Sequence, residues 1–261
     1  MSIRQKIIVT LFLFFLPCLM GDTFSRGDDT RTEAPEIYST NNSWGANFSI
    51  GTNYTDGNVD FFAFSSSVSA FKHIDDHYFN LQGSYVYREV NGDAIFDKLQ
   101  AFLRYDYFLS DLWRIFVLNT HSRNQFLDLD YRVTIGVGVW YDIFLNDTIQ
   151  NGISFAPIYN YEQFAGDIDD ETIELSFRNI FKWHIGEGVE FVADVFFIPN
   201  ANNFDDYRFF GLFYFETKIY SDTLFLRVSL QEEYDSKPQD DIKHSDVIFT
   251  TSLVFKFGSE G

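Results

Sequence analysis

Apolar and polar residues alternate along most of the chain, and this alternation limits the folds that the sequence can adopt. In residues 131–143, the odd positions carry tyrosine, valine and isoleucine, while the even positions carry arginine, threonine, glycine, tryptophan and aspartate. Successive side chains of a strand point to opposite faces, so this pattern predicts a strand with one apolar face. Residues 173–183 and 224–233 repeat the pattern, with Asn179 as a polar interruption. These segments run to roughly 11 to 16 residues, which is long enough to cross a bilayer at a tilt.

We expect about twelve such segments. They cover residues 43–54, 58–72, 77–90, 95–109, 112–124, 129–144, 148–163, 171–186, 188–199, 206–220, 223–236 and 244–257. An even number of antiparallel strands closes a barrel with both ends on the periplasmic side of a bacterial outer membrane. The sequence therefore predicts an all-β fold, a transmembrane antiparallel up-and-down β-barrel.

The connections between these segments alternate in length. Short connections occur at residues 110–111, 146–147, 186–188 and 221–222, and these should be periplasmic turns. Longer, acidic connections occur at residues 91–93, 165–170, 200–206 and 236–242, and these should be extracellular loops. The extracellular acids would be Asp167, Asp169, Asp170, Glu171, Asp205, Asp206, Asp240 and Asp241. Such oxygens could bind a hard cation, but their spacing matches no calcium loop, so solvated acids are the favoured interpretation.

The N-terminal residues are typical of export. Arg4 and Lys6 precede an apolar run at residues 7–20 that is shorter than a membrane-spanning helix, which indicates a secretory signal peptide. Cys18 leaves a lipoprotein signal open as an alternative. The predicted organisation is a signal peptide at residues 1–21, a flexible periplasmic segment at 22–42, the barrel at 43–257 and a C-terminal tail at 258–261.

Composition agrees with a bilayer environment. Aromatic residues make up 20% of the chain, including 32 phenylalanines, and the formal net charge is −19. So acidic a chain is repelled by nucleic-acid phosphates, which excludes nucleic acid as a partner. The aromatic side chains need an apolar medium, and outer-membrane lipid and lipopolysaccharide would supply it.

Counting outward from the short turns predicts which charged residues face each other inside the barrel. The expected cross-strand pairs are Glu216 with Arg227, Arg208 with Asp235, His184 with Glu190, and Arg132 with Glu162. The charged residues expected to line the lumen are Arg104, Asp106, Arg132, Glu162, Glu174, Arg178, Lys182, Arg208, Glu216, Arg227, Glu233 and Asp235.

Two interpretations of these lumen charges stay open. They could line a pore that selects or binds a small solute or cation, or they could neutralise one another in a narrow, largely filled interior. We favour the second, because aromatic residues are also expected to point inward, namely Phe62, Phe64, Trp140, Phe196, Phe210 and Phe225. For residues 112–124 the inward face depends on the turn at Ser110–Asp111: a two-residue turn sends His121 and Arg123 inward, and a three-residue turn sends them outward.

Catalysis finds little support in the sequence. His121 and Ser122 loosely resemble part of the Ser-His-Asn site of outer-membrane phospholipases, but adjacent strand residues point to opposite faces. A nucleophile and its base must lie within hydrogen-bond reach of each other. The five histidines are scattered and form no metal-ligand pattern, so we expect no cofactor, no metal and no enzymatic activity.

The last expected strand ends in Leu253-Val254-Phe255-Lys256-Phe257, a terminal pattern that bacterial barrel-assembly machinery reads, although four residues follow the phenylalanine. With residues 57–58, 107–111, 130–138 and 234–238, this strand resembles the salt-induced outer-membrane protein family, a barrel family of unassigned function. The resemblance covers nearly all of the chain after the signal peptide. It implies a link to osmotic or acid stress and no catalytic residues.

The functional hypothesis from the sequence is a narrow channel or an envelope-stress structural protein in the outer membrane. An alternative is an adhesin or receptor that acts through the acidic extracellular loops. A third hypothesis is a lipid hydrolase.

Overall fold

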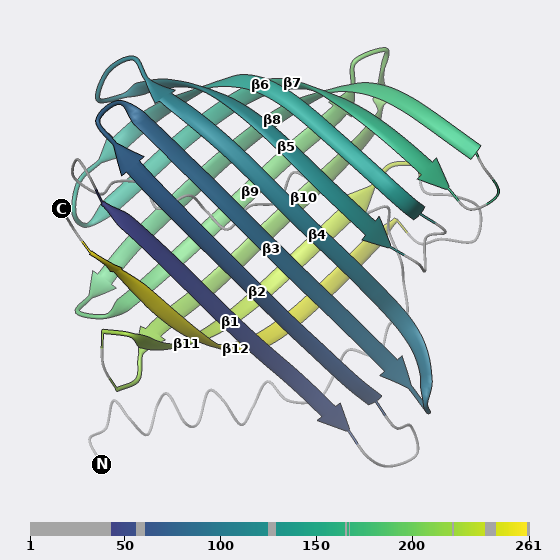
Figure 1. The fold of residues 1–261 in the computed structure, drawn as a ribbon, viewed down its shortest axis with the longest axis horizontal. Helices are drawn as coiled ribbons and strands as arrows, with labels where there is room; N and C mark the ends of the chain where they lie inside the picture. The colour runs from purple at the N-terminus through teal and green to yellow at the C-terminus, as the bar shows by residue number, and fades with distance from the viewer. Residues whose placement is uncertain are drawn as a thin grey trace.

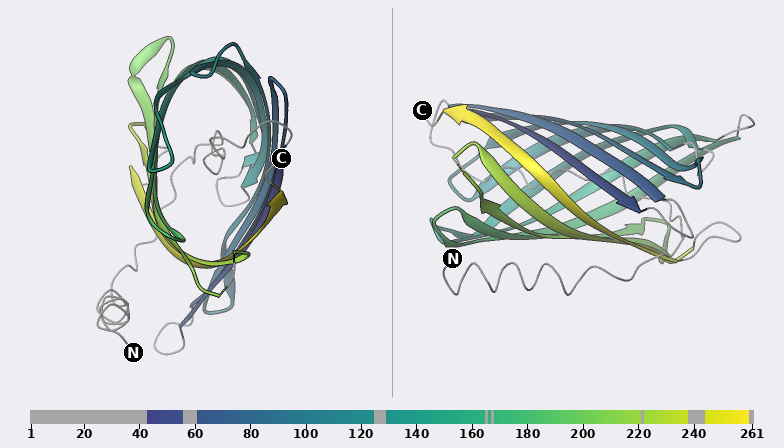
Figure 2. Two further views of the ribbon diagram at one scale, coloured as in Figure 1. Left: turned by 90° about the vertical axis from the view of Figure 1, so that its left-hand side faces the viewer. Right: turned by 90° about the horizontal axis from the view of Figure 1, so that it is seen from below.

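The computed structural model describes residues 43–55, 61–124, 129–164, 166, 168–220, 222–237 and 244–259. These residues form twelve antiparallel strands that close into one barrel (Figures 1 and 2), which confirms the predicted fold class. The strands are β1 (Trp44–Thr55), β2 (Phe61–Ile74), β3 (His77–Val90), β4 (Asp93–Phe108), β5 (Trp113–Asn124), β6 (Leu129–Leu145), β7 (Ile149–Phe164), β8 (Ile168–Gly186), β9 (Val189–Asn200), β10 (Asn203–Lys218), β11 (Leu224–Asp235) and β12 (Ser245–Ser259).

Within the described residues, no helix has the length and hydropathy to cross a membrane. The expected signal peptide and periplasmic segment, residues 1–42, lie outside the described residues, as do Asp167, Asp240 and Asp241.

Closure of the barrel joins its first and last strands. β1 pairs with β12 from Trp44 opposite Ser259 to Gly51 opposite Ser252, and every other strand pairs with its neighbours in sequence. The start of β1 and the end of β12 therefore lie at the same rim (Figure 2). In the predicted orientation this is the periplasmic rim.

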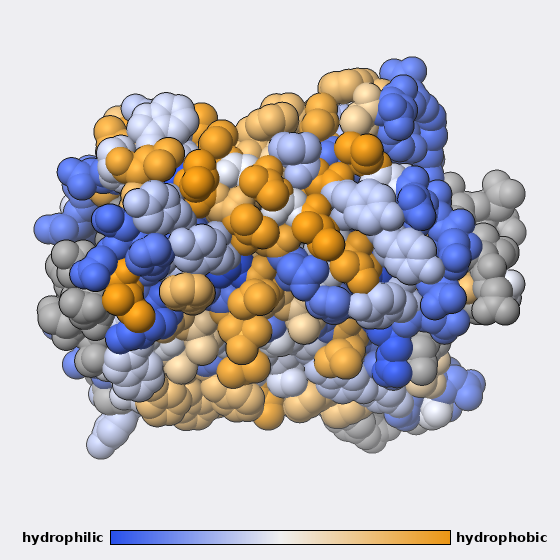
Figure 3. Space-filling view, turned by 45° about the horizontal axis from the view of Figure 1, so that its top comes forward, coloured by the Kyte–Doolittle hydropathy of each residue, from blue (hydrophilic) through white to orange (hydrophobic). Residues whose placement is uncertain are grey.

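The outer face of the barrel is apolar. Large hydrophobic residues such as Leu81, Leu99 and Val137 are at least half exposed, because their side chains point away from the lumen. The space-filling view shows an apolar band between hydrophilic rims (Figure 3). Near the rim opposite the chain ends, the rings of Tyr207 and Tyr234 stack with centroids 5.9 Å apart. An apolar band flanked by aromatic residues is the outer surface that a membrane barrel needs.

Two acidic connections are shorter than expected. β8 begins at Ile168 and β10 at Asn203, so five of the predicted loop acids lie within strands: Asp169, Asp170, Glu171, Asp205 and Asp206. The ladder continues because each β8 residue from 168 to 171 pairs with a residue of β7. Charged side chains at a solvated rim do not interrupt backbone hydrogen bonds, so composition alone placed these strand ends wrongly.

The expected alternation of short and long connections holds only in part. The turn between β3 and β4 is a tight hairpin, in which Asn91 and Gly92 have φ angles of 52° and 87°. Positive φ at both central positions is typical of a type I′ turn. This connection, although expected to be extracellular, is as short as the periplasmic turns.

The register also settles which face of two strands is inward. Phe108 pairs with Arg114 around a three-residue turn, so Arg114 lies inside the barrel and Arg123, with its side chain 46% exposed, lies outside.

The prediction that Phe62 and Phe64 point inward is wrong. Phe62 is 36% exposed, since the odd positions of β2, which include Ser65 and Ser67, face the lumen and the even positions face outward.

Candidate functional site

The predicted lumen charges lie on the inner face of the barrel. All except Arg227 are buried, and the Arg227 side chain is 12% exposed. The four predicted cross-strand pairs are confirmed by the register, including Glu216 opposite Arg227 and Arg208 opposite Asp235. Their function as a group stays a prediction.

One cluster of paired charges lies between β4, β5 and β6. Arg104 donates two hydrogen bonds to Asp106, at 2.8 and 2.6 Å. Arg114 Nη2 lies 3.5 Å from Asp142 Oδ1, which also accepts a 2.6 Å hydrogen bond from the Trp140 indole. These carboxylates therefore face cations rather than open space, which is the condition for burying a charge without a large penalty.

A second cluster lies between β8, β9 and β10. Arg178 donates to Asp194 at 2.8 and 2.7 Å, and its guanidinium lies 4.5 Å from the centre of the Phe196 ring. Arg208 contacts Glu174, which also accepts a 2.6 Å hydrogen bond from Asn160.

Sequence reasoning missed several members of these clusters. Asp194 was not among the candidates, although the predicted pairing of His184 with Glu190 already places the even positions of β9 inside. Arg114 was missed because the length of its turn was undetermined. Lys256 on β12 was missed as well.

Apolar side chains fill the space between these charges. The buried cluster draws on all strands from β4 to β10 and consists of Phe102, Phe116, Leu118, Trp140, Ala156, Ile158, Ile180, Val192, Phe196, Ile198, Phe210 and Tyr214. The Arg104 guanidinium lies 3.9 Å from the centre of the Phe116 ring, so charges and aromatics interleave. We call this side of the lumen the packed half.

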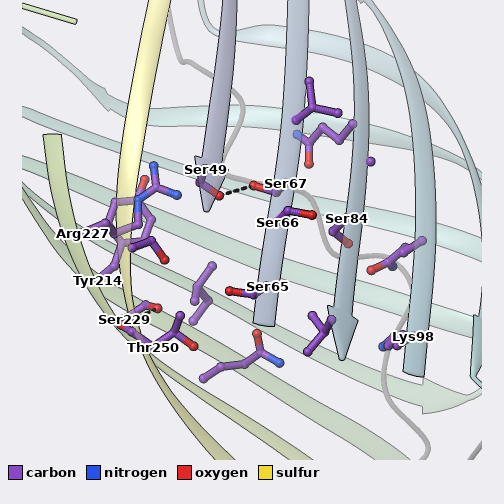
Figure 4. A pocket seen from close by; sticks show the side chains of 18 of the residues that line it. Ser49, Ser65, Ser66, Ser67, Ser84, Lys98, Tyr214, Arg227, Ser229 and Thr250 are labelled. Carbon is purple, nitrogen blue, oxygen red and sulfur yellow. Dashed lines mark hydrogen bonds between the residues drawn. The ribbon is translucent and has the colours of Figure 1, made fainter. Parts of the chain in front are cut away.

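The other side of the lumen contains a cavity of about 240 Å³ (Figure 4). Its wall is formed by β1–β4 and β10–β12, and we call it the open half. The lining residues are Ser49, Ser65, Ser66, Ser67, Val68, Gln82, Gly83, Ser84, Val86, Arg88, Lys98, Gln100, Phe102, Phe210, Leu212, Tyr214, Arg227, Ser229, Gln231, Glu233, Thr250 and Ser252. Hydroxyl and amide groups predominate, and Ser49 and Ser67 hydrogen-bond across neighbouring strands at 2.6 Å.

An ion-pair network stands at the boundary between the two halves. Glu216 accepts from Arg227 at 2.8 and 3.0 Å and from Lys256 at 2.5 Å. These side chains come from β10, β11 and β12, so one carboxylate links three strands. Arg227 lines the cavity with its charge already compensated.

The remaining candidates are dispersed. Asp169, Glu171 and Asp205 are exposed at the rim opposite the chain ends, whereas Asp170 and Asp206 are half-buried. Among the described residues, no group of three acidic, histidine or cysteine side chains could hold a metal ion. His121 is exposed on the outer face and Ser122 is buried in the lumen, so these two residues do not form a nucleophile–base pair.

Comparison with solved structures places the fold among outer-membrane barrels. An outer-membrane channel from Pseudomonas putida F1 has a TM-score of 0.53 with 10% identity over 87% of this chain and 100% of that chain. The NanC porin has a TM-score of 0.48 with 10% identity over 83% of this chain and 99% of that chain. The CymD monoaromatic hydrocarbon channel has a TM-score of 0.46 with 10% identity over 93% of this chain and 96% of that chain. At 10% identity, the similarity to the Pseudomonas putida F1 channel shows the fold alone.

No curated protein matches the chain. A family model does match, over residues 48–257, and its description is that of a protein of unknown function. The expected resemblance to a barrel family of unassigned function is thus confirmed, while the link to salt or acid stress stays a prediction. With strands β1 to β12 nearly all inside the matched range, the chain belongs to the family described as protein of unknown function, DUF481.

Proposed function

We propose that this protein is a narrow channel of the bacterial outer membrane, which passes small polar solutes through the open half of its lumen. In this proposal residues 1–21 direct export, the barrel-assembly machinery inserts the chain, and the outer face contacts lipid and lipopolysaccharide.

The division of the lumen is the observation that carries this proposal. Polar side chains from seven strands surround a cavity of about 240 Å³, and the packed half beside it is filled by aromatics and paired charges. Pockets for drug-sized ligands measure about 300 to 1,000 Å³, so a solute that fits the open half is small. A general porin would lack the packed half.

The two interpretations of the lumen charges then apply to different regions. In the packed half, Arg104 and Arg178 bind carboxylates of the barrel wall, and we assign these ion pairs a structural role. The path for solute follows the uncharged polar groups on the other side. Catalysis has no part in it.

Planar-bilayer recording tests the proposal. The wild-type protein is expected to give discrete single-channel steps. Ser67→Trp fills the cavity and should lower their conductance by about half or more. Leu253→Trp on the outer face, where Leu253 is exposed, is the matched control and should leave the conductance unchanged. Absence of discrete steps from the wild-type protein at every salt concentration would show that the proposal is wrong and leave a structural role in the envelope.

A further inference from the structure

We infer that the open half favours small uncharged polyhydroxylated solutes, such as monosaccharides and polyols, over ions of the same size. This inference names the solute class and rests on the proposed channel function.

Hydroxyl groups face the cavity from two sides. β1 and β2 contribute Ser49, Ser65 and Ser67, and β11 and β12 contribute Ser229 and Thr250 (Figure 4). A hydroxyl both donates and accepts, and it rotates to suit its partner. Such a wall can therefore either donate hydrogen bonds to the hydroxyls of a passing solute or accept hydrogen bonds from them. A wall of cations could only donate, and a wall of carboxylates could only accept.

Exchange of hydrogen bonds would make entry of such a solute inexpensive in free energy. A neutral solute that enters the cavity gives up hydrogen bonds to water and forms similar ones with the wall, so the net change per bond is small. The 2.6 Å contact between Ser49 and Ser67 shows hydroxyls of neighbouring strands at hydrogen-bond distance, where either group can turn to a solute.

The charges that line the cavity are already engaged by the protein. Arg227 binds Glu216, and Glu233 accepts a 2.6 Å hydrogen bond from Gln231. Arg88 and Lys98 interact with other groups too. An ion that loses its water here would have to displace a partner from one of these side chains, and a desolvated charge without compensation is costly. The wall therefore replaces less of the hydration free energy of an ion than of a sugar.

Proteoliposome swelling with three probes of one size measures this preference: glucose, which is neutral, gluconate, which is anionic, and glucosamine, which is cationic. For the wild-type protein, we expect glucose to enter about threefold faster than either charged probe. Equal or faster entry of gluconate or glucosamine would overturn the inference.

Variants that remove hydroxyls at nearly constant volume separate chemistry from pore size. Thr250→Val combined with Ser229→Ala and Ser252→Ala should slow glucose entry about fivefold and leave the conductance in KCl within about twofold. Thr251→Val, on the outer face of the same strand, is the control and should change neither. Unchanged glucose entry in the triple variant would also overturn the inference.

Two further measurements keep the outcomes distinct. If the triple variant does not fold, Ser65→Ala with Ser67→Ala on β2 replaces it, with the same expected slowing. Failure of the channel proposal looks different, because the wild-type protein would then show neither conductance in KCl nor entry of any probe.

Discussion

Glu216 shows how much a single side chain contributes to this lumen. It is 2% exposed and binds two cations, Arg227 on the adjacent strand β11 and Lys256 on β12 beyond it. Removal of one partner from a buried ion pair costs about 3–5 kcal/mol. Loss of the Glu216 carboxylate would leave Arg227 and Lys256, whose side chains are only 12% and 28% exposed, without compensation of their charges.

We therefore expect Glu216→Gln to lower the free energy of unfolding by about 3 kcal/mol or more, measured by urea titration of the barrel in lipid vesicles. Asp222→Asn is the control. Asp222 also binds a cation, Lys218 at 2.9 Å, but its side chain is 94% exposed, so the expected change is below about 0.5 kcal/mol. Equal effects of the two substitutions would contradict the structural part assigned to Glu216.

Residue pairs on two strands that a short turn joins could be predicted from the sequence, and contacts between other strands could not. Glu216 and Arg227 were paired correctly because a turn fixes the register of the two strands that it joins. Lys256 reaches the same carboxylate from a strand that is not joined to β10 by a turn. Counting along the chain gives no register for such a contact.

At the scale of strands, glycine makes space for the aromatic residues of the packed half. A Cβ atom at Gly152 on β7 would lie 2.2 Å from Cζ2 of Trp140 on β6. Gly83, in the middle of β3, has no such neighbour, since its nearest contact would be Val68 at 3.6 Å.

Gly152→Ala is therefore expected to destabilise the barrel by about 1–3 kcal/mol, as overpacking of a filled interior does. Gly83→Ala should change the free energy of unfolding by less than about 0.5 kcal/mol. Urea titration of both variants, with the tryptophan fluorescence of the folded state as a second readout, checks the difference. A tolerated Gly152→Ala would mean that Trp140 is not held against β7.

Strand positions followed from the alternation, and strand ends did not. Inside the bilayer, every second residue of a strand faces lipid and must be apolar, so the alternation identifies the membrane-spanning part of each strand. Beyond the bilayer, the ladder of β8 continues through Asp169 and Glu171, where water tolerates any side chain. The pattern therefore carries no information about where the ladder stops.

At the scale of the whole molecule, pairing of β1 with β12 closes the sheet, so each of the twelve described strands has a hydrogen-bonded neighbour on both sides. A closed barrel must break several ladders together to unfold, so it resists detergent without heat. We expect the purified protein to migrate on a detergent gel at two positions, the faster without boiling and the slower after it. One position under both conditions would contradict the closed barrel.

The division of the lumen could not be read from the sequence. Inward-facing positions were predicted for most strands, but the alternation gives no distance between side chains on opposite walls. Phe102 on β4 and Phe210 on β10 both belong to the packed half and both line the cavity. Only closure of the barrel brings β4 and β10 together at the boundary between the packed half and the open half.

The packed half concentrates stability on one side of the barrel, and this has a consequence for sequence variation. Substitutions at the serines and threonine that line the cavity replace no member of the apolar cluster that β4–β10 form. The solute path can thus change by mutation while the scaffold persists. Engineers who seek a new permeability could randomise these hydroxyl positions and keep the remainder of the lumen fixed.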